Sequence, residues 1–260
     1  MNEDCVLVSY ADAVATVTVN RPAVLNALNT QTISKLRSTF LDLKLDDAVR
    51  CVVLTGAGDR AFVAGADIAE LASLGPKEVR EFSEAGHQLC FLIEGLGKPV
   101  IAVLKGFVLG GGCEIAMACT LRISSSGARL GLPEISLGII PGFGGTQRLP
   151  RLIGRGRALQ MLLTGDPIEA DEALRIGLVN CVVESEELVE EANRLALALA
   201  VQAPAAVRGI LEAVGHGSDM SLVNASMLER NTFGLIYSSD DASEGVTAFL
   251  EKRKPGFTGR

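Results

Sequence analysis

Residues 100–119, VIAVLKGFVLGGGCEIAMAC, contain the features that decide the fold. Val100 to Leu104 is a short apolar run suited to a buried strand, and Ile115 to Cys119 has the composition of a buried helix. Three consecutive glycines, Gly110 to Gly112, lie between the two. A strand that passes through a glycine-rich turn into a helix is typical of layered α/β domains, so this segment predicts an α/β fold.

The same order of elements extends in both directions along the chain. Apolar and β-branched runs predict strands, and apolar residues at helical spacing predict helices. We expect strands at 14–19, 51–55, 121–124 and 130–137, and helices at 30–46, 76–93 and after the second glycine-rich turn at 141–145. Repeated strand-then-helix order favours a core of parallel strands.

The last part of the chain has a different pattern. From about residue 186 onward, apolar residues recur at helical spacing and strand signals are few. We therefore expect a core domain at 1–185 and a helical C-terminal region at 186–260.

Composition limits the classes of function. Hydrophobic residues make up 48% of the 260 residues, and no apolar run approaches the roughly 18 needed to span a bilayer, so we expect no membrane partner. The formal net charge of -7 argues against a nucleic-acid partner. The acidic start, Met1 to Asp4, has no leader-like pattern, and the six cysteines form no C-x-x-C pair; both features favour a cytoplasmic protein with reduced thiols.

Few side chains are available for chemistry. The sequence has two histidines, neither at metal-ligand spacing, and contains no G-x-S-x-G elbow and no phosphate-binding P-loop. We therefore expect no metal and no Ser-His-Asp chemistry. Carboxylates and glycine-rich backbone remain as the chemical tools.

Two glutamates stand alone among apolar neighbours. Glu114 follows the three glycines, and Glu134 follows Pro133 in an apolar stretch. A buried carboxylate is costly unless it is neutralised or hydrogen-bonded, so such residues are candidates for proton transfer. The structural alternatives are that Glu114 serves the first turn of a helix, where negative charge is favoured, and that Glu134 is a surface residue after a turn. The glycines Gly110 to Gly112 could equally serve close packing.

Four ordered segments resemble a known family. They are Asn20 to Pro22 with Asn26 to Leu28, Phe62 to Ile68, Gly110 to Glu114, and Leu132 to Glu134 through Gly144 to Arg148. On these segments, and on the tail Phe249 to Arg253, the chain resembles the enoyl-CoA hydratase/isomerase (crotonase) superfamily over nearly its whole length. The short-chain enoyl-CoA hydratases are the most similar members.

The resemblance implies a fold and an assembly. It implies a crotonase-like fold, shared with ClpP, that is built from repeated ββα units. It also implies a helical C-terminal region that mediates trimerisation, giving a homotrimer or a hexamer made as a dimer of trimers.

The resemblance also implies an active site. The backbone N–H groups of Ala66 and Gly111 would form an oxyanion hole, Glu134 would exchange the proton at the α-carbon, and Glu114 would activate water. The resemblance implies no metal and no cofactor, because coenzyme A is part of the substrate. The implied substrate and coenzyme A contacts are Ala64, Ala66, Asp67, Ile68, Gly111, Pro133, Gly142, Phe233 and Lys252, with Phe233 reaching across from a neighbouring subunit.

The implied activity is a hydro-lyase that adds water to a trans-2-enoyl-CoA, in fatty-acid β-oxidation or related acyl-CoA metabolism. Keeping both glutamates favours hydration over a Δ3,Δ2-enoyl-CoA isomerase, a branched-chain hydratase or another crotonase-fold enzyme. A non-catalytic scaffold that binds coenzyme A or RNA is a third alternative. Ala23-Val24 and Ala69 depart from the pattern, since many relatives carry lysines near these positions.

Overall fold

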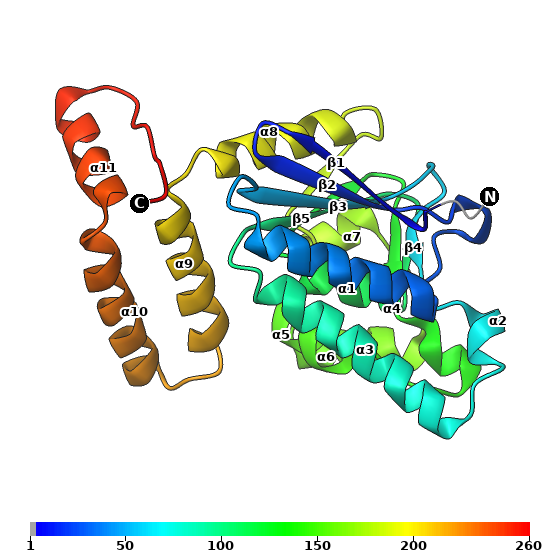
Figure 1. Cartoon of the computed structure of the whole chain (residues 1–260). Coiled ribbons are helices and arrows are strands. Elements are labelled where there is room, and N and C mark those ends of the chain that lie inside the picture. Colours follow the sequence, from blue (N-terminus) through cyan, green and yellow to red (C-terminus); the bar gives the residue numbers. More distant parts are fainter. Residues whose placement is uncertain (1–3) are drawn as a thin grey trace.

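The computed structural model describes residues 4–260 and contains two β-sheets (Figure 1). The larger sheet has the strand order β1-β2-β3-β5-β7-β10, and the smaller one has the order β4-β6-β8-β9. The strands are β1 (Val6–Ala11), β2 (Val14–Val19), β3 (Cys51–Gly56), β4 (Ala61–Ala64), β5 (Val100–Leu104), β6 (Phe107–Leu109), β7 (Leu121–Ser125), β8 (Arg129–Gly131), β9 (Ile168–Glu169) and β10 (Cys181–Val183). Of the acidic start, Met1, Asn2 and Glu3 lie outside the described residues.

The chain alternates between the two sheets. β3, β5 and β7 are neighbours in the larger sheet, and the strands that follow them, β4, β6 and β8, are parallel neighbours in the smaller sheet. Each pair of strands leads into helical structure. These are the repeated ββα units that the resemblance implies, and they bring three strand ends of the smaller sheet to one place.

Helices cover both faces of the larger sheet. The helices of the chain are α1 (Thr30–Leu45), α2 (Ile68–Leu71), α3 (Pro76–Glu94), α4 (Gly111–Ala118), α5 (Gly145–Ile153), α6 (Arg155–Thr164), α7 (Ala170–Arg175), α8 (Leu188–Ala200), α9 (Pro204–Gly217), α10 (Leu222–Tyr237) and α11 (Asp240–Glu251). Alternate residues of β3 serve the two faces, as expected for a strand buried on both sides. Val52 and Leu54 belong to the core shared with α1 and α3, whereas Cys51 and Val53 pack in the cluster that contains α8.

The C-terminal helices α9, α10 and α11 stand apart from the rest of the molecule, on the side away from α2 and α3 (Figure 1). α8 differs from them, because four of its residues are buried against the larger sheet. Within residues 4–260 no single helix is long and apolar enough to cross a membrane. α8 and α9 meet that test only as a pair, and this pair is bent by 104° at the break between them.

One expected strand is wrong. The apolar stretch 130–137 forms only the end of β8, which stops at Gly131, and then the 3-10 helix η2 (Pro133–Leu137). Proline has no N–H for a strand ladder, and its fixed φ suits the first turn of a helix instead. In addition, α4 begins at Gly111, four residues before the helix-like run that starts at Ile115, so the glycines are part of the helix.

Candidate active site

A cavity of about 880 Å³ lies at the carboxyl ends of three parallel strands. Ala64, Leu109 and Gly131 are the last residues of β4, β6 and β8, and they are in register with one another. The segments that continue past these residues therefore emerge side by side. The open carboxyl end of a parallel sheet is the usual place for a ligand site in α/β proteins.

Two backbone N–H groups point toward this cavity from neighbouring strand ends. Ala66 forms a parallel bridge with Leu28, and this bridge uses Gly65 O and Asp67 N, so the N–H of Ala66 points to the opposite side. Gly111 is the first residue of α4, where an N–H has no partner within its own helix. Both residues line the cavity. Two such donors can bind one carbonyl oxygen and stabilise negative charge on it.

The turn before Gly111 requires glycine. Gly110 has φ 51° and ψ -127°, a conformation that other residues rarely adopt. A Cβ at this position would also lie 2.9 Å from Oε1 of Glu134. The glycine therefore allows both the turn into α4 and the close approach of a carboxylate.

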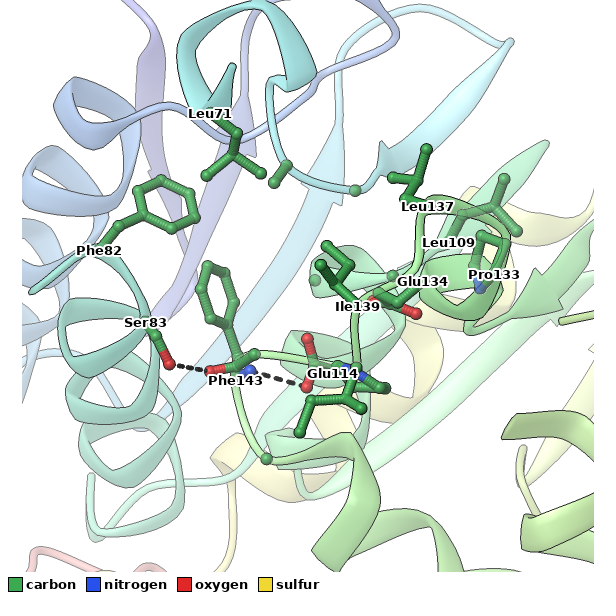
Figure 2. A pocket seen from close by; sticks show the side chains of 18 of the residues that line it. Leu71, Phe82, Ser83, Leu109, Glu114, Pro133, Glu134, Leu137, Ile139 and Phe143 are labelled. Carbon is green, nitrogen blue, oxygen red and sulfur yellow. Dashed lines mark hydrogen bonds between the residues drawn. The ribbon is translucent and has the colours of Figure 1, made fainter. Parts of the chain in front are cut away.

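Glu114 lies in the first turn of α4, and it is almost completely buried. Its Oε1 accepts a hydrogen bond from the N–H group of Phe143 at 2.8 Å (Figure 2) and another from the N–H group of Gly145 at 2.6 Å. Burial raises the pKa of Glu114, while these two backbone N–H groups and the positive charge of Arg148 act in the opposite direction. One oxygen is thus fixed by backbone, and the carboxylate lines the cavity.

The loop that holds Glu114 is itself held by side chains. Arg148 donates from Nη1 to Phe143 O at 2.9 Å, and its guanidinium forms two hydrogen bonds of 2.6 and 2.7 Å with the carboxylate of Glu94. The ring of Phe143 is buried against Phe82, with 5.4 Å between ring centroids. It fills the space beside Gly86, where a Cβ would overlap the ring. α3 and α5 therefore position the loop between them.

Glu134 is held much less tightly. It lies on η2, and its Oε2 is buried without a hydrogen-bond partner among residues 4–260. Burial raises the pKa of Glu134 to about 7; its own backbone hydrogen bond opposes that rise, and the negative charge of Glu114 adds to it. A carboxyl group with a pKa near neutrality can both donate and accept a proton under physiological conditions. Two glutamates with different environments thus face one cavity (Figure 2).

The comparison with family models matches residues 9–260 to "Enoyl-CoA hydratase/isomerase". The chain belongs to the enoyl-CoA hydratase/isomerase family. It is 47% identical, over 97% of both chains, to the crotonyl-CoA hydratase of Syntrophomonas wolfei, and 48% identical, over 98% of both chains, to the short-chain-enoyl-CoA hydratase of Clostridium acetobutylicum. The crystal structure of an enoyl-CoA hydratase from Bacillus anthracis has a TM-score of 0.97 and 39% identity, covering 99% of this chain and 100% of that one. These matches confirm the crotonase-like fold that the sequence resemblance implies.

The structure brings most of the residues expected from the family resemblance to the cavity. The residues in its lining are Ala64, Ala66, Ile68, Gly111, Glu114, Pro133, Glu134 and Gly142. Asp67 is not in that lining as the described residues define it; its carboxylate pairs with Arg21 at 2.9 Å and caps α2 through Glu70 N. The Arg21 hydrogen bond is the main reason that the pKa of Asp67 is lowered.

Phe233 and Lys252 do not line the cavity within the described chain either. Phe233 is an exposed residue of α10 that stacks on Tyr237, with 6.0 Å between ring centroids. Lys252 is the C-cap of α11. Both lie in the C-terminal helices that stand apart from the core, so one copy of the chain does not bring them to its own cavity (Figure 1).

Sequence reasoning missed the residues that hold Glu114. The N–H groups of Phe143 and Gly145, the side chain of Arg148, and Ser83, whose Oγ donates to Gly142 O, were not expected to serve the site. The only signal was the second glycine-rich turn at 141–145, which marks a site for close backbone approach without naming its partner. Among residues 4–260 no group of three or more His, Cys, Asp or Glu residues is arranged to hold a metal ion.

Proposed function

We propose that this protein is an enoyl-CoA hydratase, a hydro-lyase that reversibly adds water to a trans-2-enoyl-CoA to give a (3S)-3-hydroxyacyl-CoA. The observation that carries this proposal is the pair Glu114 and Glu134 beside the free N–H groups of Ala66 and Gly111, all in one cavity. The names of the relatives, crotonyl-CoA hydratase and short-chain-enoyl-CoA hydratase, support the same reaction.

The first task of the site is to polarise the thioester. Its carbonyl oxygen accepts hydrogen bonds from the N–H groups of Ala66 and Gly111, which draws electron density from the conjugated double bond and makes the β-carbon electrophilic. These donors belong to fixed backbone at the ends of β4 and β6, so they need little reorganisation as charge develops on the oxygen.

The two carboxylates then divide the proton transfers. Glu114, ionised, takes a proton from water while the water oxygen bonds to the β-carbon. Glu134, protonated, delivers a proton to the α-carbon as the electron pair returns from the carbonyl oxygen. The sum is one water added across one double bond, and exchange with solvent then moves the proton from Glu114 back to Glu134, which restores the starting form. The dehydration reaction runs through the same steps in reverse.

The environments of the two groups suit these roles. The N–H groups of Phe143 and Gly145 favour the ionised form of Glu114, the form that can act as a base. The pKa of about 7 leaves Glu134 substantially protonated at neutral pH, the form that can act as an acid. Pairs of titratable groups with different environments commonly divide acid and base duties in this way.

The test is a panel of enoyl-CoA thioesters given to the purified protein. We expect loss of the conjugated trans-2-enoyl absorbance and formation of the (3S)-hydroxyacyl product. A protein that shifts a 3-enoyl double bond to position 2 but adds no water is an isomerase, and one that binds thioesters without changing them is a scaffold. Either result overturns the proposal. Straight and branched thioesters of increasing length in the same panel define the acyl preference.

We further propose that the active form is a trimer or a dimer of trimers that uses the C-terminal helices. α9, α10 and α11 expose large apolar side chains in numbers that an isolated subunit rarely leaves in water. These residues include Ile210, Val214, Leu222, Val223, Phe233, Leu235, Phe249 and Leu250. Sedimentation at micromolar concentration tests the assembly, and a monomer would contradict it.

In such an assembly Lys252 binds a phosphate of coenzyme A in a neighbouring subunit's site, with Phe233 beside the nucleotide. Lys252→Ala should then raise KM for full-length thioesters and leave kcat unchanged, because the contact is common to the ground and transition states. Pantetheine thioesters, which lack the nucleotide, should be unaffected. Lys254→Ala is a matched control two residues away, and equal effects of Lys252→Ala on both kinds of substrate would reject the assignment.

A further inference from the structure

Ser83 makes an unusual hydrogen bond for a serine on a helix. It lies on α3 and lines the cavity, and its Oγ donates to Gly142 O at 2.5 Å, 59 residues further along the chain (Figure 2). Helical serines usually bond to the carbonyl of the preceding turn. Ser38 in α1 and Ser218 at the C-cap of α9 do so, bonding to Lys35 O and Val214 O. The Ser83 hydroxyl instead serves another segment.

The peptide group that accepts this hydrogen bond is the one that donates to Glu114. The carbonyl of Gly142 and the N–H of Phe143 belong to one planar trans peptide, so they point in opposite directions. Ser83 holds the carbonyl end, and the N–H end donates to Glu114 Oε1 at 2.8 Å. A single rigid unit thus connects the Ser83 hydroxyl on α3 with the carboxylate on α4.

We propose that Ser83 is a positioning residue for Glu114, which acts through the peptide between Gly142 and Phe143. The inference rests on the proposed hydratase function. The hydroxyl fixes the rotation of this peptide and polarises it, because hydrogen bonds in a chain strengthen one another. Both effects strengthen the N–H donor that orients Oε1 of Glu114 and that favours its ionised form. No equivalent support reaches Glu134, which lies on η2 and does not bond to this loop.

The effect of Ser83 on Glu114 can be measured separately from the effects of the other groups that face Glu114. Arg148 of α5 acts on it through charge, Glu134 of η2 is the other carboxyl group, and the thiols of Cys90 and Cys113 lie close enough to interact electrostatically. All four remain when Ser83 is changed. Ser83 carries no charge, so any change in Glu114 after its replacement comes through the shared peptide.

The test compares Ser83→Ala with Ser83→Thr in the full-length protein. We expect Ser83→Ala to lower kcat for hydration by about 3- to 10-fold, the usual worth of one hydrogen bond. The acidic limb of its kcat profile should move to higher pH, because a weaker N–H donor stabilises the carboxylate less. Ser83→Thr keeps the hydroxyl and should restore both the rate and the profile. Ser38→Ala, which removes an exposed helical serine hydroxyl far from the cavity, should behave as wild type.

A second measurement separates positioning from general damage. Exchange of the α-hydrogen of butyryl-CoA in D₂O uses Glu134 and the oxyanion hole but needs no water activation at the β-carbon. We expect Ser83→Ala to exchange at the wild-type rate. Equal losses in hydration and exchange, or an unchanged hydration rate and pH profile, would overturn the inference. A wild-type protein that hydrates nothing would instead refute the proposed function.

Discussion

Glu114 and Glu134 face the same cavity, but the regions that carry them differ in structure. Glu114 belongs to a regular helix, and its Oε1 is bonded to two backbone N–H groups of the loop between Gly142 and Gly145. Glu134 belongs to a short 3-10 helix, and its Oε2 is buried with no bonding partner in the described chain. The loop at 142–145 fixes the carboxylate of Glu114 in place, whereas fewer hydrogen bonds fix the carboxyl group of Glu134.

The difference shows how one cavity can contain both an acid and a base. Burial raises the pKa of both glutamates. At Glu114 the N–H groups of Phe143 and Gly145 and the positive charge of Arg148 oppose that rise, whereas at Glu134 only its own backbone opposes it and the charge of Glu114 adds to it. The hydrogen bonds and charges around the two groups therefore differ in the direction that the proposed roles require.

Replacing each glutamate by glutamine should give the largest effect and tests the difference between the two groups directly. Each variant should lose on the order of 10²-fold or more in kcat for hydration, a typical contribution of a general acid or base. They should differ in α-hydrogen exchange in D₂O, which Glu134→Gln should abolish and Glu114→Gln should retain. Thioester binding should survive in both variants, because the N–H groups of Ala66 and Gly111 remain.

The outcome has two clear alternatives. If both variants hydrate enoyl-CoA at near wild-type rates, the glutamates are structural and the two-carboxylate mechanism is wrong. If both lose exchange equally, the division of roles fails although the site is correct.

Gly110→Ala tests whether catalysis needs the carboxylate of Glu134 to lie close to the backbone of Gly110. The new Cβ would lie 2.9 Å from Glu134 Oε1, on a backbone with positive φ. Strain of this kind costs about 1–3 kcal/mol, and we expect a loss of roughly 10- to 100-fold in kcat as Glu134 and the N–H of Gly111 are displaced. Gly127→Ala is the matched control, since no atom lies within 4 Å of its Cβ position. A Gly110→Ala enzyme with wild-type kinetics would show that this turn has no catalytic role.

The pH dependence of hydration and dehydration tests the protonation states of the two glutamates. Hydration needs protonated Glu134, so its kcat should fall as pH rises through about 7, by up to tenfold for each pH unit. Dehydration starts from the same pair of carboxyl groups with its single proton on Glu114, so it should fall over the same range as that proton is lost. Profiles measured at saturating crotonyl-CoA and at saturating 3-hydroxybutyryl-CoA test this directly. Opposite trends in the two directions would contradict the proposal that the pair shares one proton.

The sequence indicated the two carboxylates that line the cavity, but not the groups that hold them in place. Glu114 and Glu134 stand out locally, because each is a lone charge among apolar or glycine residues. The backbone donors Ala66 and Gly111 came from the family resemblance, since an N–H group leaves no mark in composition. The α/β core was predictable from short apolar strands alternating with amphipathic helices.

The features that the sequence did not predict depend on tertiary contacts, which no local pattern encodes. Ser83 was missed because its partner, Gly142, lies 59 residues away and the bond is made to backbone. The expected strand at 130–137 failed because apolar residues on either side of Pro133 resemble a strand, while the proline ends the ladder. Local signals therefore locate the chemistry, and packing between α3, α4 and α5 determines its geometry.

Glu134 should also affect the stability of the folded protein, by a smaller amount that depends on pH. Its pKa is about 7 in the folded protein and near 4.5 in the unfolded chain, so the folded form binds more protons between these values. The stability of the wild type should therefore fall as pH rises from about 4.5 to 7 and remain lower above 7. Glu134→Gln removes this titration, and the neutral amide avoids the burial of a charge.

We expect Glu134→Gln to be more stable than wild type at pH 8, by on the order of 1–2 kcal/mol once partial solvent exposure is allowed for. The advantage should nearly vanish at pH 5, where Glu134 is protonated in the folded wild type. Thermal unfolding at the two pH values measures it as a difference of a few degrees. Residues placed for catalysis often lower the stability of the folded protein. If Glu134→Gln is more stable than wild type only above neutral pH, the ionised carboxylate of Glu134 is the cause of that lower stability. A gain of equal size at pH 5 would assign it to packing, and a loss at pH 8 would mean that the charge of Glu134 is better stabilised than its surroundings indicate.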